Sequence, residues 1–443
     1  MDKEGREERL RLAKKNLEKV RKISYPEGFK VGSWWESRQN LVIESIQNFK
    51  TCEDVVNYAQ KGRTSGFDHR REDARGLTYY KTQEIKRLYP GFLEKNKDLQ
   101  DSEFSLKETV YDIDGSKYSN IFLTHVNCYL RSRLTFDNLL SDEAGTKNAT
   151  INRVIEIGGG YGGLARIFKL LHSDVCYTIV DLLESLFFAY IFLSLNFPEL
   201  KILFIQNDQD FNYDDYDIVL VPVQFCNVLR NEEYDIVVNT GSLQEMPDVT
   251  VKFWMNFIQN VIRVRLFYSW NYFLNNKKQH KETGDESNLM CPLLDQFWDV
   301  KYFKINPKII TVDANGRNWL ELCAERIPVV KQDKEREIQA SHQCYEISKY
   351  FSPGSDDWFQ NIWVAITKNR SEKKFILEML KGIDIYKKGL GARNNTYQKR
   401  LVNLRDVLKL NIQYLKFKIK KFLRYKDSST YSEEEYYESI LKK

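Results

Sequence analysis

The sequence lacks the usual marks of secreted, metal-binding and membrane-spanning proteins. Its 7 cysteines are scattered without a C-x-x-C pair, which indicates free thiols in a reducing compartment and neither a zinc site nor a redox dithiol. No spacing of His, Asp or Glu indicates a metal site. The charged N-terminus has no apolar signal-peptide core, and the longest apolar stretch, 182–197, is shorter than the roughly 20 residues of a membrane span. We therefore expect a cytoplasmic protein.

Proline is also scarce, with 9 residues among 443, which argues against long extended linkers. Apolar residues make up 42% of the chain and charged residues 29%, an ordinary globular balance that excludes a chain disordered throughout. A chain of this length is expected to form two or three domains. The net charge of +5 is too small to indicate nucleic-acid binding by itself, and we predict no nucleic-acid partner.

Hydrophobic patterning divides the chain into three regions. Residues 1–150 show helical patterning without a visible ladder of strands, so we expect a mainly helical region. Residues 151–330 alternate short apolar runs with helical segments, the pattern of a parallel sheet covered on both faces. Near the end of this region, KYFKINPKIITVD and NWLELCAER predict a closing hairpin. Residues 331–443 are helical again and increasingly basic.

The most informative segment is VIEIGGGYGG at 154–163, where an apolar strand leads into glycines and a helix follows. Glycines at such a turn permit positive φ and let a ligand approach the backbone closely. A second strand ends at Asp181, whose carboxylate can accept hydrogen bonds from both hydroxyls of a ribose. A nucleoside is therefore expected across the carboxyl ends of these strands.

Two nucleoside cofactors fit the turn. Residues 158–163 match the G-x-G-x-x-G of dinucleotide sites, and Asp181 lies where such a site has its acidic residue. With Glu156, the same turn also matches E-x-G-x-G-x-G, the signature of S-adenosylmethionine methyltransferases. A carboxylate two residues before the first glycine suits a cofactor with a cationic amino acid end and no pyrophosphate, and so favours the second cofactor. A glycine turn without any ligand is the third interpretation.

VIEIGGGYGGLARIF, followed by YTIVDLLESL and YDIVVNTGSLQEMP, resembles the sugar O-methyltransferases of bacterial surface-polysaccharide loci over residues 150–330. The resemblance implies an α/β protein with a Rossmann-like class I methyltransferase sheet, mostly parallel and seven-stranded with a closing hairpin, and with helical N-terminal and C-terminal additions. It implies S-adenosyl-L-methionine as methyl donor and a sugar hydroxyl of a surface polysaccharide, or of its precursor, as acceptor. Residues 1–150 would then act as an acceptor-binding cap.

The resemblance also implies roles for single residues. Glu156, Gly158 and Gly160 would face the methionine part of the cofactor, and Asp181 its ribose. Gln224, which follows the strand DIVLVP, would lie beside the adenine, with Asn207 or Asp208 as the alternative. The other expected cofactor-binding positions are Gly159, Gly162, Leu182, Asn239 and Ser242.

A sugar hydroxyl is a weak acid, so its methylation is expected to need a general base. Glu245 can serve as that base or bind sugar hydroxyls, although Ser242 and Glu245 also have the spacing of a helix capping box. Asn271 and Tyr272 are expected to point into the same cleft, and Trp270 into the core. Three histidines are further candidate bases, each more simply explained as a structural or solvent-exposed residue: His69, His125 and His280.

The C-terminal region carries an unusual positive charge, with 16 Lys or Arg and 5 Asp or Glu in residues 371–430. Residues 401–426 place apolar side chains on one stripe of a helix with lysines around it. Such a helix suits peripheral contact with an anionic membrane, here its inner face, where lipid-linked glycans are modified. Docking of the apolar stripe on the protein body explains the pattern equally well.

Two other functions stay open on the sequence alone. The G-x-G-x-x-G match leaves an NAD-dependent oxidoreductase on a Rossmann fold as an alternative. A methyltransferase-like fold that has lost catalysis and serves as an assembly module is the other. The sequence indicates neither the particular sugar nor the oligomeric state.

Overall fold

The computed structural model describes most of the first 326 residues and scattered positions after them. The described segments are 3–60, 74–144, 151–208, 211–272, 298–305 and 319–326, with single positions between 338 and 381. The chain divides into two compact units, residues 1–275 with 279–331, and residues 276–278 with 332–443. The expected basic helix at 401–426 lies outside the described residues, as do His69 and His280, and these expectations stay predictions.

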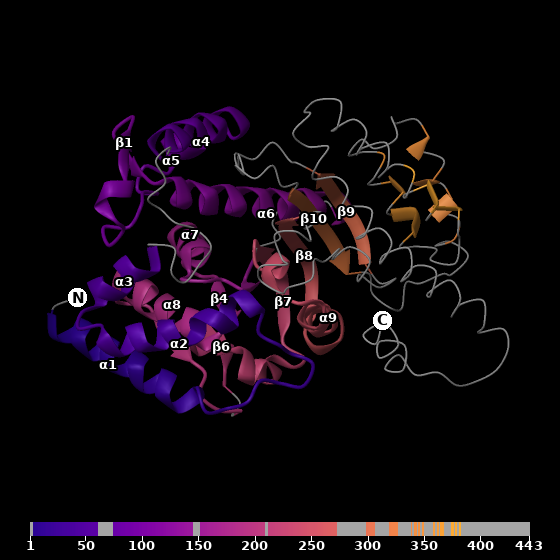
Figure 1. Ribbon diagram of the computed structural model, residues 1–443. Helices are drawn as coiled ribbons and strands as arrows, with labels where there is room; N and C mark the ends of the chain where they lie inside the picture. The colour runs from indigo at the N-terminus through magenta and orange to yellow at the C-terminus, as the bar shows by residue number, and fades with distance from the viewer. Residues whose placement is uncertain are drawn as a thin grey trace, which may run out of the picture. The chain divides into compact units, whose positions relative to one another are not determined.

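The first unit is built on an eight-stranded sheet, counted within the described segments (Figure 1). In spatial order the strands are β5 (Ile202–Phe204), β6 (Ile218–Pro222), β4 (Cys176–Asp181), β3 (Arg153–Ile157), β7 (Glu233–Thr240), β8 (Arg263–Tyr272), β10 (Trp319–Arg326) and β9 (Trp298–Ile305). The strand order runs outward in opposite directions from the neighbours β3 and β7. In an open α/β sheet such a reversal leaves a crevice at the carboxyl ends of the strands, where ligands bind.

All neighbouring strands are parallel except β10, which runs antiparallel to both β8 and β9. The inner strands are continuous apolar runs because helices cover both of their faces. The predicted closing hairpin is confirmed as β9 and β10. The predicted number of seven strands is corrected to eight, because the apolar run at 202–204 pairs with β6 and adds a short edge strand.

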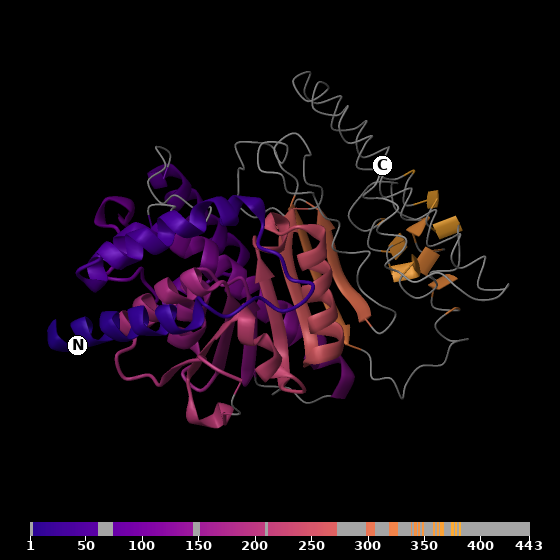
Figure 2. The ribbon, with the colours of Figure 1, turned by 60° about the horizontal axis from the view of Figure 1, so that its bottom comes forward.

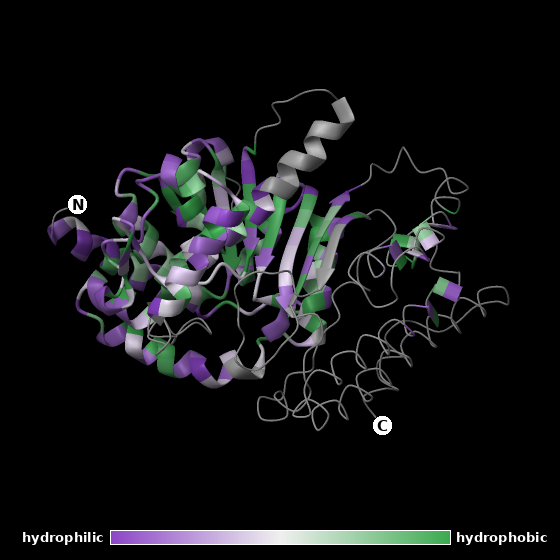
Figure 3. Ribbon diagram, turned by 90° about the horizontal axis from the view of Figure 1, so that it is seen from above, coloured by the Kyte–Doolittle hydropathy of each residue, from purple (hydrophilic) through white to green (hydrophobic). Residues whose placement is uncertain are grey.

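Helices cover both faces of the sheet. The helices α7 (Gly163–Leu171) and α8 (Leu183–Asn196) lie on one face, and α9 (Asp248–Asn256) lies on the other, along β7 and β8 (Figures 1 and 2). Right-handed crossovers dictate this division because the strand order reverses between β3 and β7. Hydrophobic residues concentrate along the strands (Figure 3), and the core between the layers holds fully buried rings such as Tyr177, Phe187 and Trp254.

The N-terminal region is mainly helical and belongs to the same compact unit as the sheet. Its helices are α1 (Lys3–Val20), α2 (Ser33–Asn48), α3 (Cys52–Gln60), α4 (Ala74–Leu88), α5 (Phe92–Lys95) and α6 (Asn120–Ala144). The helix α6 packs on α7, while α1 and α3 pack on α8. This arrangement explains the long apolar stretch at 182–197: α8 is buried all round because the sheet lies on one side of it and α1 and α3 lie on the other.

One feature of this region differs from expectation. Residues 111–118 form a hairpin of β1 (Tyr111–Ile113) and β2 (Ser116–Tyr118), where no strands were predicted. The two turn residues, Asp114 and Gly115, both have positive φ, as a two-residue hairpin turn requires. Strands of three residues are too short to produce a recognisable alternation in the sequence.

Short helical turns follow or precede several strands: η1 (Lys107–Thr109), η2 (Tyr213–Asp215), η3 (Val223–Leu229), η4 (Leu243–Glu245) and the π-helical turn η5 (Phe257–Val261). Of these, η3 and η4 begin directly beyond the carboxyl ends of β6 and β7, and therefore border the crevice. Among the helices of the described segments, none has the length and hydrophobicity needed to cross a bilayer.

Candidate active site

The glycine turn follows β3 at the carboxyl edge of the sheet. Gly158 and Gly160 have φ angles of +75° and +57°, which glycine adopts without strain. A Cβ on Gly158 would stand 1.9 Å from Ser242 Oγ, so this position has no room for a side chain. A Cβ on Gly160 would meet nothing within 4 Å. Gly160 therefore presents its backbone to open space, where a ligand can approach closely.

Two further glycines are required by packing. A Cβ on Gly159 would lie 2.8 Å from Glu156 Oε2. Gly162 precedes α7 with φ of +85°, and a Cβ there would lie 2.9 Å from a methyl group of Leu193. Gly162 does not line the cavity described below, so its role is to shape the turn.

Asp181 ends β4 and faces the glycine turn. Its Oδ2 accepts a hydrogen bond from the Gly160 N–H at 2.8 Å, and its Oδ1 accepts one from the Leu182 N–H at 2.6 Å. Burial raises the pKa of Asp181 to about 7, although these N–H groups and the Ser185 hydroxyl favour the ionised form. Each carboxylate oxygen has a second lone pair, so Asp181 can still accept hydrogen bonds from ligand hydroxyls.

Glu156 lies in β3 and is only 3% exposed. The Tyr177 hydroxyl donates a hydrogen bond to its Oε2 at 2.9 Å. Burial raises the pKa of Glu156 to about 8, against the effect of the Tyr177 hydroxyl and with a smaller contribution from the charge of Asp181. A nearby cation stabilises the ionised form of such a carboxyl. The turn is therefore suited to a positively charged ligand.

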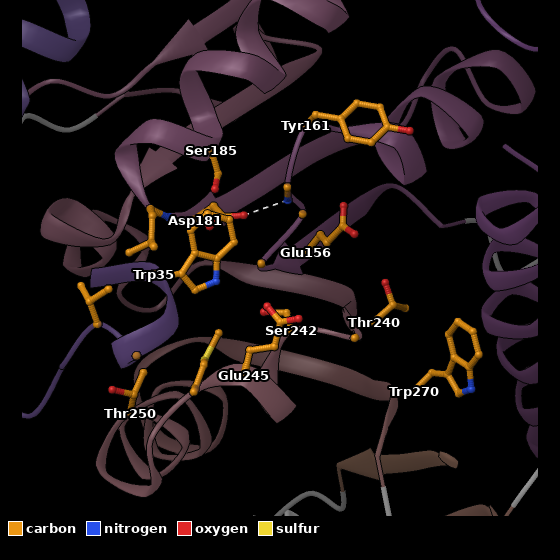
Figure 4. A pocket seen from close by; sticks show the side chains of 18 of the residues that line it. Trp35, Glu156, Tyr161, Asp181, Ser185, Thr240, Ser242, Glu245, Thr250 and Trp270 are labelled. Atoms are coloured by element: carbon orange, nitrogen blue, oxygen red, sulfur yellow. Dashed lines mark hydrogen bonds between the residues drawn. The ribbon is translucent and has the colours of Figure 1, made fainter. Parts of the chain in front are cut away.

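A cavity of about 1060 Å³, including its open mouth, lies over these groups (Figure 4). It brings together most of the site residues predicted from the sequence: Glu156, Gly158, Gly159, Gly160, Asp181, Leu182, Ser242 and Glu245. It also takes in sheet-side residues that the sequence analysis did not assign to the site: Tyr161, Ser185, Thr240, Gly241, Met246, Thr250 and Trp270. Thr240, Gly241 and Trp270 stand at or directly after the end of a strand, a position that the strand pattern alone could have flagged, whereas Thr250 reaches the cavity from α9.

The opposite wall of the cavity comes from the N-terminal region. Residues 29–32 line it from the segment that leads into α2, and Trp35 lines it from the first turn of α2. Ile121, Thr124, His125 and Cys128 line it from α6. Sequence reasoning missed all of these except His125, because they reach the crevice only through tertiary packing of helices on the sheet.

Ser242 and Glu245 do not form the capping box that was the alternative interpretation. Ser242 precedes η4 but makes no side-chain cap hydrogen bond to it. Its hydroxyl instead lies against Gly158, as the distance to a Cβ there shows. Figure 4 shows the side chains of Ser242 and Glu245 together at the cavity. Both residues are thus placed where a bound ligand can contact them.

Asn239 and Asn271 form a buried amide cluster rather than part of the cavity lining. The Asn239 Nδ2 donates to the Ile157 carbonyl at 2.7 Å, and the Asn271 Nδ2 donates to Asn239 Oδ1 at 2.8 Å and to Ser269 Oγ at 2.9 Å. This corrects the expectation that Asn271 points into the cleft with its neighbours. Side chains alternate along a strand, so Asn271 faces away from Trp270, and Trp270 lines the cavity.

Gln224 and Tyr272 are two other site residues predicted from the sequence. Gln224 lies in η3 directly after β6 and does not line the cavity, but its Oε1 is buried and has no hydrogen-bond partner among the described residues. A buried acceptor of this kind can be satisfied by a ligand N–H group. The alternatives Asn207 and Asp208 do not line the cavity either. Tyr272 is the last residue of β8, and its side chain lies outside the described part of the chain.

His125 reaches the cavity from α6 and packs over the start of α7. A Cβ on Gly163 would stand 2.3 Å from His125 Cε1, so the imidazole fills the space above the first residue of α7. The Tyr161 ring lies beside it with a centroid distance of 5.9 Å. The imidazole therefore packs directly beside the first residue of α7. Within the described segments, no cluster of His, Cys, Asp and Glu is arranged to hold a metal ion.

No protein-family model and no curated protein matches the chain. Similar solved structures include the mitomycin 7-O-methyltransferase MmcR, at 10% identity over 47% of this chain and 57% of that chain, with a TM-score of 0.29. Phosphoethanolamine N-methyltransferase 2 of Haemonchus contortus, in complex with S-adenosyl-L-methionine, is 11% identical over 44% of this chain and 52% of that chain, with a TM-score of 0.28. The methyltransferase domain of bacterial CtHen1 is 12% identical over 45% of this chain and 99% of that chain, with a TM-score of 0.30.

Because these scores are low, the fold assignment rests on the sheet itself. Dinucleotide-binding Rossmann sheets have the strand order 3-2-1-4-5-6. Here the last strand in the sequence, β10, is instead inserted antiparallel between β8 and β9. With the glycine turn after β3 and the acidic residue at the end of β4, this order is that of a Rossmann-like α/β fold, in agreement with the sheet expected from the sequence.

Proposed function

We propose that this protein is an S-adenosyl-L-methionine-dependent methyltransferase. The observation that carries the proposal is the pair of carboxyl groups, Glu156 and Asp181, that flank a glycine turn inside one cavity. Asp181 stands where ribose hydroxyls can donate to it, and the buried carboxyl of Glu156 favours a cationic amino acid end.

The geometry of the turn disfavours NAD, the alternative cofactor. A pyrophosphate is held by free N–H groups of the glycine turn and the helix after it. Here the Gly158, Gly160 and Gly162 N–H groups donate to the Val180 carbonyl, the Asp181 carboxylate and the Gly159 carbonyl. The ionised carboxyl of Glu156, beside the turn, would in addition repel a phosphate group.

The residues of the cavity have distinct parts in the proposed reaction. When bound, S-adenosylmethionine supplies a methyl group already activated by a positively charged sulfur. Asp181 and Glu156 bind the cofactor and orient it, while Trp35 and Trp270 exclude water from the cavity. A carboxylate oxygen of Glu245 accepts the proton of the acceptor hydroxyl as general base.

Calorimetric titration tests the proposed cofactor. Wild-type protein is expected to bind S-adenosylmethionine and S-adenosylhomocysteine and to show no saturable heat with NAD. Saturable binding of NAD alone would sink the proposal and favour the oxidoreductase.

We propose further that the acceptor is a sugar hydroxyl of a surface glycan or its precursor. The resemblance of residues 150–330 to sugar O-methyltransferases supports this, as do the aromatic ring of Trp270 and the hydroxyl of Thr240, which suit the apolar face and polar edge of a sugar. Labelled methyl transfer to a panel of glycans and nucleotide sugars, with amines and proteins as controls, tests it. Transfer to an amine only would refute the sugar assignment, and cofactor binding without any transfer would favour the assembly module.

The basic segment 401–426 is proposed to hold the protein at an anionic membrane where lipid-linked acceptors lie. Support comes from the sequence, since this segment lies outside the described residues. Co-sedimentation of the full chain with phosphatidylserine vesicles, weakening as salt rises, is the expected result. Equal binding to neutral vesicles would remove the electrostatic basis of this proposal.

A further inference from the structure

The segment between α1 and α2 crosses from one face of the sheet to the other and is fastened at its far end to α9. Figure 2 shows this loop, in indigo, reaching across to α9. The Lys30 N–H donates to Thr250 Oγ1 at 2.9 Å, and the Thr250 hydroxyl donates to the Lys30 carbonyl at 2.6 Å. The Phe29 ring packs edge-on against Phe253 and Trp254, with centroid distances of 5.6 and 6.0 Å. We call residues 25–32 the strap.

The near end of the strap is fastened to α2, which packs against α8. The Gln39 Nε2 donates to the Tyr25 hydroxyl at 3.0 Å. Burial raises the pKa of Glu184, which is 7% exposed in the first turn of α8, and the nearby Gln39 side chain lowers it. Gln39 thus stands between α2 and the helix that begins directly after Asp181 and Leu182.

Trp35 lies one helical turn before Gln39, so both side chains project from the same face of α2. With α2 fixed by Gln39 and the strap fixed by Thr250, the indole of Trp35 extends into the cavity on the side of Asp181 and Ser185 (Figure 4). Leu182, which is 8% exposed, supplies an apolar surface to the same part of the cavity. A flat aromatic ligand group beside Asp181 would therefore find both an indole and a leucine side chain in the same cavity.

We propose that Trp35 stacks on the adenine of the bound nucleoside and that the strap holds it there. This inference rests on the proposed function, because it assumes that the cavity takes an adenosyl compound. The adenine half of the site is then completed by a helix of the N-terminal region, outside the methyltransferase sheet. The strap and α2 are part of the cofactor site, and the remaining N-terminal wall, on α6, is left to the acceptor.

The test compares adenosine and S-adenosylhomocysteine as ligands in calorimetric titrations of wild type, Trp35→Ala and Trp35→Phe. Stacking of a base on an aromatic side chain is worth enough that Trp35→Ala should weaken binding between about 5-fold and 150-fold. The loss should be equal for the two ligands, because both carry the adenine and only one carries the amino acid end. Trp35→Phe should keep most of the affinity, since phenylalanine retains a stacking surface.

The matched control is Leu41→Ala, at a residue of α2 that is 61% exposed and takes no part in the cavity. Leu41→Ala should bind both ligands as wild type does, and Trp35→Leu replaces the alanine variant if the latter does not fold. The inference would be overturned if a folded Trp35→Ala or Trp35→Leu variant bound both ligands with the affinity of wild type, or if the loss were confined to S-adenosylhomocysteine. If wild type binds neither ligand, the proposed function itself is refuted, and that result is distinct from a failure of the inference about Trp35.

Discussion

The carboxylate of Asp181 has two roles. It holds the glycine turn by accepting a hydrogen bond from the Gly160 N–H and, in the proposed function, it accepts hydrogen bonds from the ribose hydroxyls. Asp181→Asn keeps the size of the side chain but replaces one acceptor oxygen by a donor. We expect it to weaken S-adenosylhomocysteine binding by about 1–3 kcal/mol, since a buried hydrogen-bonding group is left mismatched. Calorimetric titration measures the change, and circular dichroism checks the fold. Unchanged affinity in a folded variant would remove Asp181 from the site.

Glu156 should make the ligand-free protein less stable as pH rises. The folded-state pKa of about 8 lies above the ordinary value of 4.5, so the folded protein holds a proton that the unfolded chain has released. The stability associated with this proton is fully present below about pH 4.5 and is lost as pH rises through 8. Glu156→Gln cannot ionise and still offers an oxygen to the Tyr177 hydroxyl.

We therefore expect the stability of Glu156→Gln to exceed that of wild type at pH 9 and to approach it at pH 5. Each unit of pKa shift corresponds to about 1.4 kcal/mol, so the difference should reach a few kcal/mol. Urea unfolding of the ligand-free proteins at the two pH values measures it. If the free energies of unfolding of wild type and Glu156→Gln differed by the same amount at both pH values, Glu156 would not titrate in this range. The same variant should bind S-adenosylmethionine more weakly, because it offers the cation no charge.

At the residue scale, the sequence predicted best those positions whose signal is local. The glycines and Asp181 follow directly from a strand, a turn and a second strand, and the structure places Gly158, Gly160 and Asp181 in one cavity. Asn271 was assigned to the cleft because it ends a strand, but the alternation of side chains turns it toward Asn239. Which of two adjacent residues faces the crevice depends on how the strand is oriented about its own axis. The local sequence does not encode that orientation.

At the scale of elements, the two hydrogen bonds between the strap and α9 depend on a single side chain, that of Thr250. The Thr250 hydroxyl makes both hydrogen bonds to the Lys30 backbone. Thr250→Val has the same shape but removes both bonds and leaves the Lys30 N–H and carbonyl to find water. If the strap holds Trp35 in place, this variant should lose affinity for S-adenosylhomocysteine although valine still fills the same space. Thr250→Ser, which keeps the hydroxyl, should bind as wild type does.

A double-mutant cycle identifies the route of this effect. When Trp35 is already replaced by alanine, Thr250→Val should cause little further loss of affinity, because the group that the strap positions is gone. Calorimetric titration of wild type, the two single variants and the double variant gives the coupling free energy between Thr250 and Trp35. Fully additive losses would mean that Thr250 contacts the ligand independently of Trp35.

The order of helices and strands was more predictable than their contacts. Alternating apolar runs predicted the parallel strands from β3 to β8 and the closing hairpin, because a buried parallel strand has a continuous apolar sequence. The strap has no such pattern: residues 25–32 are polar and apolar in mixture, and their place over the crevice follows from the aromatic cluster around Phe29. Contacts between elements far apart in the chain leave no periodic signal in a single sequence.

At the scale of the molecule, an ion pair buried in the first unit joins its N-terminal and C-terminal parts. Arg131 of α6 donates to Glu321 of β10 through both Nε, at 2.7 Å, and a terminal nitrogen, and the Tyr268 hydroxyl donates to Glu321 at 2.9 Å. The side chains of Arg131 and Glu321 are 12% and 2% exposed. Residues 190 positions apart are thus held together. This agrees with a compact unit that includes both the N-terminal helices and the sheet.

Removing one partner of this pair should destabilise the whole unit rather than one part of it. Glu321→Gln leaves the Arg131 guanidinium without its counter-ion, and we expect a loss of about 3–5 kcal/mol. Arg131→Met combined with Glu321→Gln should lose less, because no buried charge remains unpaired. Hydrogen exchange followed by mass spectrometry should show α6 and β10 losing protection together in the single variant. If α6 became exchangeable while β10 kept its protection, the N-terminal helices would unfold as a separate body, and the cofactor site would then be assembled between two parts that open independently.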